Sequence, residues 1–417
     1  MYMKLTKKFR IKPDERLLAI CRTANNLYNQ TLYYWQQRRE NDGEFLKFYT
    51  LRNEMRDVTN LEGTKNYYLM NAHVSEFVIK LAYDAIDSFY KQIADWKKHP
   101  EKYKAKPEFP RYHKRGGYTE IQLDAHEFKI KDGNIIFNKK KGYGIPIPQW
   151  NKWKSCFEHT KMVRVLPRQG YMIIEVVYES EIRQADVNIN NVAAIDLGVD
   201  NLATLVTSSG CTIYNGKPLK AYNQNFNKKI AKAKSILDRQ QPDKRSSNRI
   251  RQLYDKRDCF IETYMHCVSR RIIDQLINEH VGLLVVGRNK GWKQESNMGK
   301  VGNQRFTQIP FFKLQSQLKY KCEMVGIKYE EQEESYTSKT DALALESIEH
   351  HETYMGSRKK RGLFQSSTNK LVNADQNGAL NILRKYLGDA AYIEATKDWK
   401  MPATPQIVNC FTKKAKE

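Results

Sequence analysis

One short segment constrains the fold of this chain more than any other. Residues 193–203 read Ala-Ala-Ile-Asp-Leu-Gly-Val-Asp-Asn-Leu-Ala, an apolar run that ends at Asp196 and is followed by Gly198 and a second apolar run. This pattern predicts a buried strand, a tight turn and a returning strand. Asp196 is then expected at a sheet edge, where a metal ion can reach its carboxylate.

A second acidic motif lies far downstream, at residues 373–383, which read Asn-Ala-Asp-Gln-Asn-Gly-Ala-Leu-Asn-Ile-Leu. Asp375 opens the last strong helical pattern, and Asn377 and Asn381 follow one helical turn apart. Taken alone, Asp196 is also compatible with a turn residue that binds backbone amides, and Asp375 is better explained as a helix N-cap. Together they indicate a metal-dependent phosphodiesterase, because such enzymes draw two or three carboxylates from distant segments.

The charge of the chain indicates nucleic acid as its partner. The 417 residues include 71 Lys and Arg against 47 Asp and Glu, a formal net charge of +24. Such an excess binds polyanions by neutralising phosphates. We expect no membrane partner, because no apolar run approaches the roughly 20 residues of a membrane span. The absence of a secretory signal and seven scattered Cys without a CxxC pair are typical of a cytoplasmic protein.

Hydrophobic periodicity predicts the elements of the first part of the chain. A strand at residues 3–11 precedes helices at about 14–40 and 69–97, and period-two alternation runs from about 117 to 182. We therefore predict a small β-barrel built from residues 1–10 and 117–185. Residues 11–116 would form a helical insertion between its strands.

The remaining residues, 186–417, predict an α/β domain. The expected elements are a strand pair at 192–214, a helical pair at 222–280, a strand at 281–286, a helix at 310–325 and a strand at 326–334. A loop and the helix that begins at Asp375 complete the order. This is the order of an RNase H-like domain with a helical insertion.

Two basic segments are candidate nucleic-acid contacts. Residues 97–115 combine Pro, Lys and Arg with interleaved aromatic side chains, a composition that suits phosphate binding and base stacking but also a solvated loop. A basic run at 358–361 lies in the loop before Asp375. The candidates are Lys106, Arg111, Lys114, Arg115, Arg358, Lys359, Lys360 and Arg361.

Three motifs together resemble the TnpB family: residues 194–199, the segment Ser-Tyr-Thr-Ser-Lys-Thr at 335–340, and the motif at 373–382. Residues 107–115 also resemble the loop that precedes the β region in this family. Its members are transposon-encoded, RNA-guided DNA endonucleases with a RuvC domain, related to the type V CRISPR effectors. The resemblance implies a guide RNA and double-stranded target DNA as partners, Mg²⁺ or Mn²⁺ as cofactor, and a bacterial or archaeal protein associated with the nucleoid.

The resemblance also implies a domain organisation. The β-barrel is expected to be a wedge domain, residues 11–116 a recognition domain, and residues 186–417 a RuvC-like nuclease domain. By rough resemblance, the recognition domain contacts a short DNA motif beside the target. The residues implied are Tyr67, Asn71, Ser75 and Lys80.

The chain departs from the family pattern at two places. Most members have a Glu at the end of the strand that here ends in Val286, whereas this chain has Gly287. The family also has a four-Cys zinc ribbon before the last Asp, whereas residues 338–372 contain no Cys, so we expect no structural zinc. His350 and His351 in the same region are expected to be solvated rather than to bind a metal.

The missing Glu raises the question of the third carboxylate that a two-metal site needs. An acidic run ends the strand expected beside Gly287, and some family members resemble this arrangement. The run contains Glu330, Glu331, Glu333 and Glu334. We predict Asp196, Glu334 and Asp375 as the catalytic and metal-binding residues, with Glu333 as second choice for the third acid and Glu295 as a further alternative.

Two other functions remain open beside that of an RNA-guided endonuclease. A nuclease-dead, RNA-guided repressor is favoured by Gly287 but opposed by the retention of Asp196 and Asp375. A DNA-only RNase H-like transposase would need a separate module that binds DNA ends, and the sequence contains none that we recognise.

Overall fold

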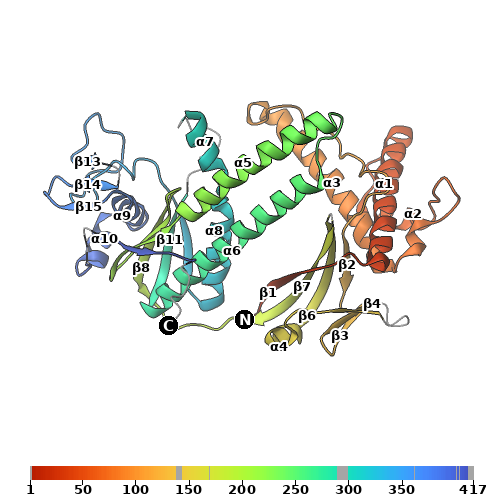
Figure 1. The fold of residues 1–417 in the computed structure, drawn as a ribbon, viewed down its shortest axis with the longest axis horizontal. Coiled ribbons are helices and arrows are strands. Elements are labelled where there is room, and N and C mark those ends of the chain that lie inside the picture. The colour runs from red at the N-terminus through yellow and green to blue at the C-terminus, as the bar shows by residue number, and fades with distance from the viewer. Residues whose placement is uncertain are drawn as a thin grey trace. The chain divides into compact units, whose positions relative to one another are not determined.

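The computed structural model describes residues 2–137, 143–168, 170–288, 299–360, 362–400, 402 and 404–411. The chain divides into two compact units, Met1–Glu181 and Ile182–Glu417 (Figure 1). Each unit has its own hydrophobic core. No helix in the described part of the chain is long and apolar enough to cross a membrane.

Two long helices, α1 (Glu15–Asp42) and α3 (Ala72–Lys98), dominate the helical part of the first unit, with the short α2 (Phe48–Glu54) between them. The carboxylate of Asp14 caps α1 by accepting the backbone N–H groups of Arg16 and Leu17. The helix ends at Gly43, whose φ of +70° is a conformation that favours glycine. The predicted strand-helix-helix order of this region is confirmed.

The strands of the first unit form two antiparallel sheets. One has the order β1 (Tyr2–Ile11), β7 (Tyr171–Glu181), β6 (Thr160–Arg168) and β2 (Ile121–Asp124). The other contains β3 (Phe128–Lys131), β4 (Asn134–Phe137) and β5 (Tyr143–Pro146), and a short helix, α4 (Trp150–Trp153), precedes β6. The predicted closed barrel is not confirmed, because the described strands make two separate sheets, although the N-terminal strand does pair with a later one.

A six-stranded sheet forms the centre of the second unit. Its order is β12 (Lys328–Glu333), β11 (Val281–Arg288), β8 (Asn188–Leu197), β9 (Asn201–Thr207), β10 (Gly210–Asn215) and β16 (Gln406–Val408). The pairs β8–β9 and β9–β10 are antiparallel, whereas β11 runs parallel to β8 and β12 parallel to β11. The predicted strand pair at 192–214 is thus three strands, and the mixed sheet agrees with the predicted α/β class.

Helices cover both faces of this sheet, as its buried parallel strands require. The helices that contact its strands are α6 (Asn248–Asn278), α8 (Phe311–Val325), α9 (Ala374–Leu387) and α10 (Asp389–Thr396). Helix α5 (Lys217–Gln240) packs on α6, and α7 (Gly299–Thr307) precedes α8. Ile195 of β8 packs in the core that contains α6 and α8, whereas Ala194 packs in the core that contains α9. The alternation along β8 therefore points Asp196, two residues after Ala194, toward α9.

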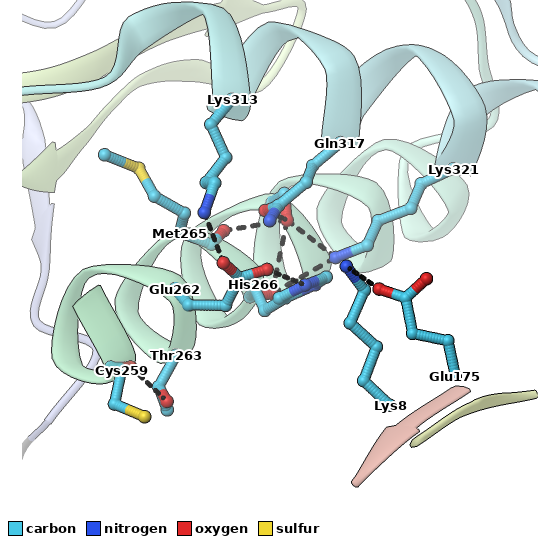
Figure 2. A network of polar contacts seen from close by, with 11 residues as sticks. Lys8, Glu175, Cys259, Glu262, Thr263, Met265, His266, Lys313, Gln317 and Lys321 are labelled. Carbon is cyan, nitrogen blue, oxygen red and sulfur yellow. Dashed lines mark hydrogen bonds and ion pairs between the residues drawn. The ribbon is translucent and has the colours of Figure 1, made fainter. Parts of the chain in front are cut away.

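Polar side chains join α6 to α8 beside their apolar contact (Figure 2). Glu262 pairs with Lys313 and lies 3.5 Å from the ring of His266, and these contacts lower the pKa of Glu262 to about 2. Further along, the hydroxyl of Ser269 contacts Gln317 at 3.1 Å and accepts from Lys321 at 2.6 Å. The two helices are thus held by charge as well as by apolar packing.

A small antiparallel sheet precedes α9 in the segment where we expect no zinc. It contains β13 (Ser357–Lys360), β14 (Leu363–Gln365) and β15 (Leu371–Asn373), none of which the hydrophobic pattern predicts. Its core is small, with Phe364, Val372 and Ala374 buried against one another. All seven cysteines of the chain lie outside this segment and are free.

Candidate active site

Asp196 is the second-last residue of β8 and lies opposite Thr204 of β9. Helix α9 packs on β8 (Figure 1). A Cβ atom placed on Gly378 of α9 would lie 2.9 Å from Oδ2 of Asp196. The glycine therefore allows the helix to approach the carboxylate closely, and Asp196 belongs to the strand rather than to a turn.

Asp375 lies in the first turn of α9, but it does not cap the helix. The cap is Asn373, whose side-chain oxygen accepts the backbone N–H of Asp375 at 2.9 Å. The explanation of Asp375 as an N-cap is therefore wrong, and its carboxylate is available for other contacts. Its Oδ2 accepts a hydrogen bond from Nδ2 of Asn201 at 2.5 Å, and Nη2 of Arg358 lies 4.0 Å from its Oδ1.

Glu334 follows β12 and is buried, with 9% of its surface exposed. A Cβ atom placed on Gly287 would lie 2.0 Å from Oε1 of Glu334 and 2.7 Å from Cδ1 of Ile382. The carboxylate of Glu334 therefore occupies the space that a side chain at position 287 would need. Since Val286 pairs with Ile195, the next residues along these parallel strands are Gly287 and Asp196.

The neighbouring acids of the same strand have other partners. Glu333 accepts hydrogen bonds from Lys385 and from the backbone N–H of Ser335, both at 2.7 Å, and these contacts lower its pKa although partial burial opposes them. Glu330 pairs with Lys328, and Glu331 pairs with Arg288. Glu334 is therefore the acid of this run that lies against Gly287, and Glu295 lies outside the described residues.

Burial and the charges of the other two carboxylates act on Asp196. Burial raises the pKa of Asp196 well above its ordinary value, and the charges of Glu334 and Asp375 raise it further, whereas Arg358 opposes the shift. Burial, with a smaller contribution from Glu333, raises the pKa of Glu334 to about 7. Oε1 of Glu334 has no hydrogen-bond partner among the described residues. The environment of Asp196 and Glu334 thus disfavours their negatively charged forms.

The described residues do not form a ready coordination shell for a metal ion. Within the described ranges, no group of three or more His, Cys, Asp and Glu side chains is close enough to hold a metal ion. The donor set nevertheless fits a divalent cation, because hard cations prefer carboxylate oxygens and a cation would relieve the repulsion that raises the pKa of Asp196. His351 contacts Ser347 instead of a metal-binding group.

The predicted nucleic-acid contacts divide into exposed and internal residues. Tyr67 and Ser75 are buried, and the hydroxyl of Ser75 donates to the carbonyl of Tyr67 at 2.7 Å, so the prediction for these two is corrected: they are internal packing residues. The exposed candidates are Asn71, Lys80, Lys106, Arg111, Lys114, Arg115, Arg358, Lys359 and Lys360. Arg361 lies outside the described residues.

Sequence reasoning missed several neighbours of the carboxylates. It placed Arg358 in a basic loop but gave no sign that the loop returns to Asp375. It also missed Asn201, because an Asn beside a turn is common for local backbone reasons and gives no sign of a distant partner. Gly378 offered a usable signal, because a glycine inside a helix commonly marks a close contact.

The chain is similar to known proteins over the regions that contain the candidate residues. The family model OrfB_IS605, described as a probable transposase, matches residues 175–293, and that of the Cas12f1-like TNB domain matches residues 311–382. The TnpB-like protein ORF457 of Acidianus two-tailed virus is 28% identical over 207 residues, which are 48% of this chain and 42% of that protein. The chain thus matches less than half the length of this curated relative.

The fold is also similar to a solved structure. A cryo-EM structure of a Cas12f1–sgRNA–target DNA complex matches with a TM-score of 0.52 and 17% identity, over 88% of this chain and 82% of that chain. The likeness shows that the mixed sheet with helices on both faces shares its fold with this Cas12f1 structure. The two family models and the viral relative show that parts of the chain, residues 175–293 and 311–382 among them, are similar to TnpB-like proteins and their Cas12f1-like relatives.

Proposed function

We propose that this protein is an RNA-guided DNA endonuclease. Asp196, Glu334 and Asp375 would form the active site in which it hydrolyses target DNA. The observation that carries the proposal is the convergence of three carboxylates from β8, the end of β12 and the start of α9. The burial of Asp196 and Glu334, and the charges that act on Asp196 from the other two acids, cost stability without an evident structural benefit. Strongly perturbed acids in such a place are typical of functional sites.

The three carboxylates would hold a divalent ion, Mg²⁺ or Mn²⁺. A bound ion of this kind activates water and neutralises charge on the reacting phosphate. Asn201 orients the carboxylate of Asp375 through its 2.5 Å hydrogen bond. Arg358 brings a guanidinium to the same carboxylate, where it can contact a phosphate of the substrate strand. Gly287 leaves room for Glu334 to take the place of an acid on β11.

The partners proposed are a guide RNA and double-stranded DNA with a short motif beside the target. The net charge of +24 supports this proposal, as does the similarity of the fold to that of Cas12f1 in its complex with sgRNA and target DNA. Base pairing would supply sequence specificity while the protein contacts the backbone. We assign guide and motif binding to the wedge segments 1–10 and 117–185 and the recognition segment 11–116.

The proposal is tested by sequencing the RNA that co-purifies with the chain expressed beside its flanking DNA, followed by cleavage of a matching plasmid in Mg²⁺. Asp196→Ala and Glu334→Ala are each expected to abolish cleavage but retain guided binding. Glu330→Ala is the matched control, because this acid pairs with Lys328 on the same strand. Full activity of Glu334→Ala would refute its assignment, and only heterogeneous cellular RNA would refute the guided mechanism and favour the transposase.

A second function, a nuclease-dead repressor, is favoured by the lack of a preformed metal group among the residues that the structure describes. It predicts guided binding of DNA without cleavage in either Mg²⁺ or Mn²⁺. Cleavage in either metal that Asp196→Ala abolishes would exclude the repressor.

A further inference from the structure

Asp341 is a fully buried carboxylate outside the candidate active site. Its Oδ1 accepts the backbone N–H groups of Leu343 at 3.1 Å and Ala344 at 3.3 Å. Its Oδ2 accepts the hydroxyl of Ser366 at 2.8 Å and, from Ser367, the backbone N–H at 2.7 Å and the hydroxyl at 3.1 Å. One carboxylate therefore joins two chain segments and uses the acceptor capacity of both oxygens.

Glu346, which is also buried, extends this connection. Its Oε2 accepts the backbone N–H of Asp341 at 2.8 Å, and its Oε1 accepts the backbone N–H of Met355 at 2.7 Å. Next to Met355, Gly356 leaves no room for a side chain, since a Cβ there would lie 2.4 Å from Cζ of Phe364. The two acids thus connect the start, the middle and the end of the segment that precedes α9.

Helix α9 holds the same segment from the other side. Buried Asn377 accepts the N–H of Ala342 at 3.0 Å and donates to the carbonyl of Thr340 at 2.7 Å. Buried Arg384 donates to the carbonyl of Glu346 at 2.5 Å. The helix that carries Asp375 in its first turn is therefore tied to the segment that carries Arg358.

We propose that Asp341 and Glu346 form a metal-free clasp that folds residues 337–373 and thereby positions Arg358 beside Asp375. The segment contains no cysteine and only a small apolar core, so these hydrogen bonds are its main cross-links. They also fix the hairpin in which Arg358 of β13 pairs with Phe364 of β14. The role in cleavage rests on the proposed nuclease function, whereas the clasp itself does not.

Asp341→Asn is the first test, because an amide has one acceptor oxygen and presents N–H groups to the donors of Ser366 and Ser367. Amide hydrogen exchange of residues 342–344 and 362–367 is expected to rise in this variant. Glu349→Gln, an exposed acid of the same loop, is the control and should leave exchange unchanged. Ser366→Ala is the milder variant, for use if Asp341→Asn fails to fold. Unchanged exchange in whichever variant folds would overturn the clasp.

Cleavage kinetics test the positioning role. Asp341→Asn should lower the rate at saturating DNA by at least about tenfold, a loss typical of groups that orient a site, and leave guided DNA binding within about twofold. If Asp341 acts through Arg358, the double variant with Arg358→Ala should lose no more than Arg358→Ala alone. Losses that multiply would overturn the coupling.

Two further measurements distinguish failure of the clasp from failure of the proposed nuclease function. The purified parent chain should contain no stoichiometric zinc, and phenanthroline should not change its hydrogen exchange; stoichiometric zinc would overturn a metal-free clasp. A parent chain that binds its guided target but does not cleave it would contradict the proposed nuclease function and the role of the clasp in cleavage. Hydrogen exchange would still decide whether the clasp exists.

Discussion

The raised pKa of Glu334 makes a quantitative prediction about stability and pH. In the folded protein, burial raises this pKa from an ordinary 4.5 to about 7, so the folded state binds a proton that the unfolded state has already released. Stability from this group is complete below pH 4.5 and is lost as the pH rises through about 7. The difference corresponds to about 3 kcal/mol in total, and to about 2–3 kcal/mol between pH 5 and 7.5.

Glu334→Gln removes this titration. It also removes one of the charges that raise the pKa of Asp196, which is raised like that of Glu334. The variant should therefore lose less stability than the parent between pH 5 and 7.5, by about 2–3 kcal/mol. For a unit of this size the difference corresponds to roughly 5–10 °C in the unfolding midpoint, measured by thermal unfolding in EDTA. Glu330→Gln is the matched control. Equal pH dependence of Glu334→Gln and the parent would refute the burial of the Glu334 carboxylate.

Four further predictions test other parts of the structure. Gly287→Ala should displace the Glu334 carboxylate and lower the rate of guided cleavage. Gly287→Glu combined with Glu334→Ala should recover the cleavage activity that Glu334→Ala alone lacks. No recovery would argue that the side chain at position 287 does not face the site. Thermal unfolding should show Mg²⁺ stabilising the parent at pH 7.5 more than at pH 5, because protons compete for the carboxylates, and an equal effect would place the ion elsewhere. Glu262→Gln should cost under about 1 kcal/mol in urea unfolding, because its ion pair with Lys313 is half exposed; a cost above about 2 kcal/mol would contradict this view. The exposed Lys228 and Lys232 of the basic helix α5 are expected to contact an RNA–DNA hybrid. Replacing both by Ala should therefore weaken hybrid binding and reduce the salt dependence of log K by about 0.9 per lysine, and an unchanged slope would exclude these lysines from the contact.

The sequence by itself determined the elements that carry two of the three acids. The apolar run before Asp196 and the helical period after Asp375 are local patterns, and local patterns are sufficient to define a strand and a helix. The strands and helices of 186–417 lie where periodicity predicted them, except for the additional strand β10, the helices α7 and α10, and the short strands β13 to β16. Those short elements contain too few residues for a periodic signal.

Only the tertiary structure distinguished Glu334 from Glu333, because adjacent acids at a strand end have the same local pattern. The distinction depends on Gly287 of the neighbouring strand, which leaves space for one carboxylate, and on Lys385 of α9, which pairs with the other. The same holds for Asp341, whose partners lie 25 and 26 residues away in the sequence. It also holds for Ser75, because the helical pattern did not show whether this side chain is buried or exposed. Each of these outcomes depends on the contact between segments, which only folding decides.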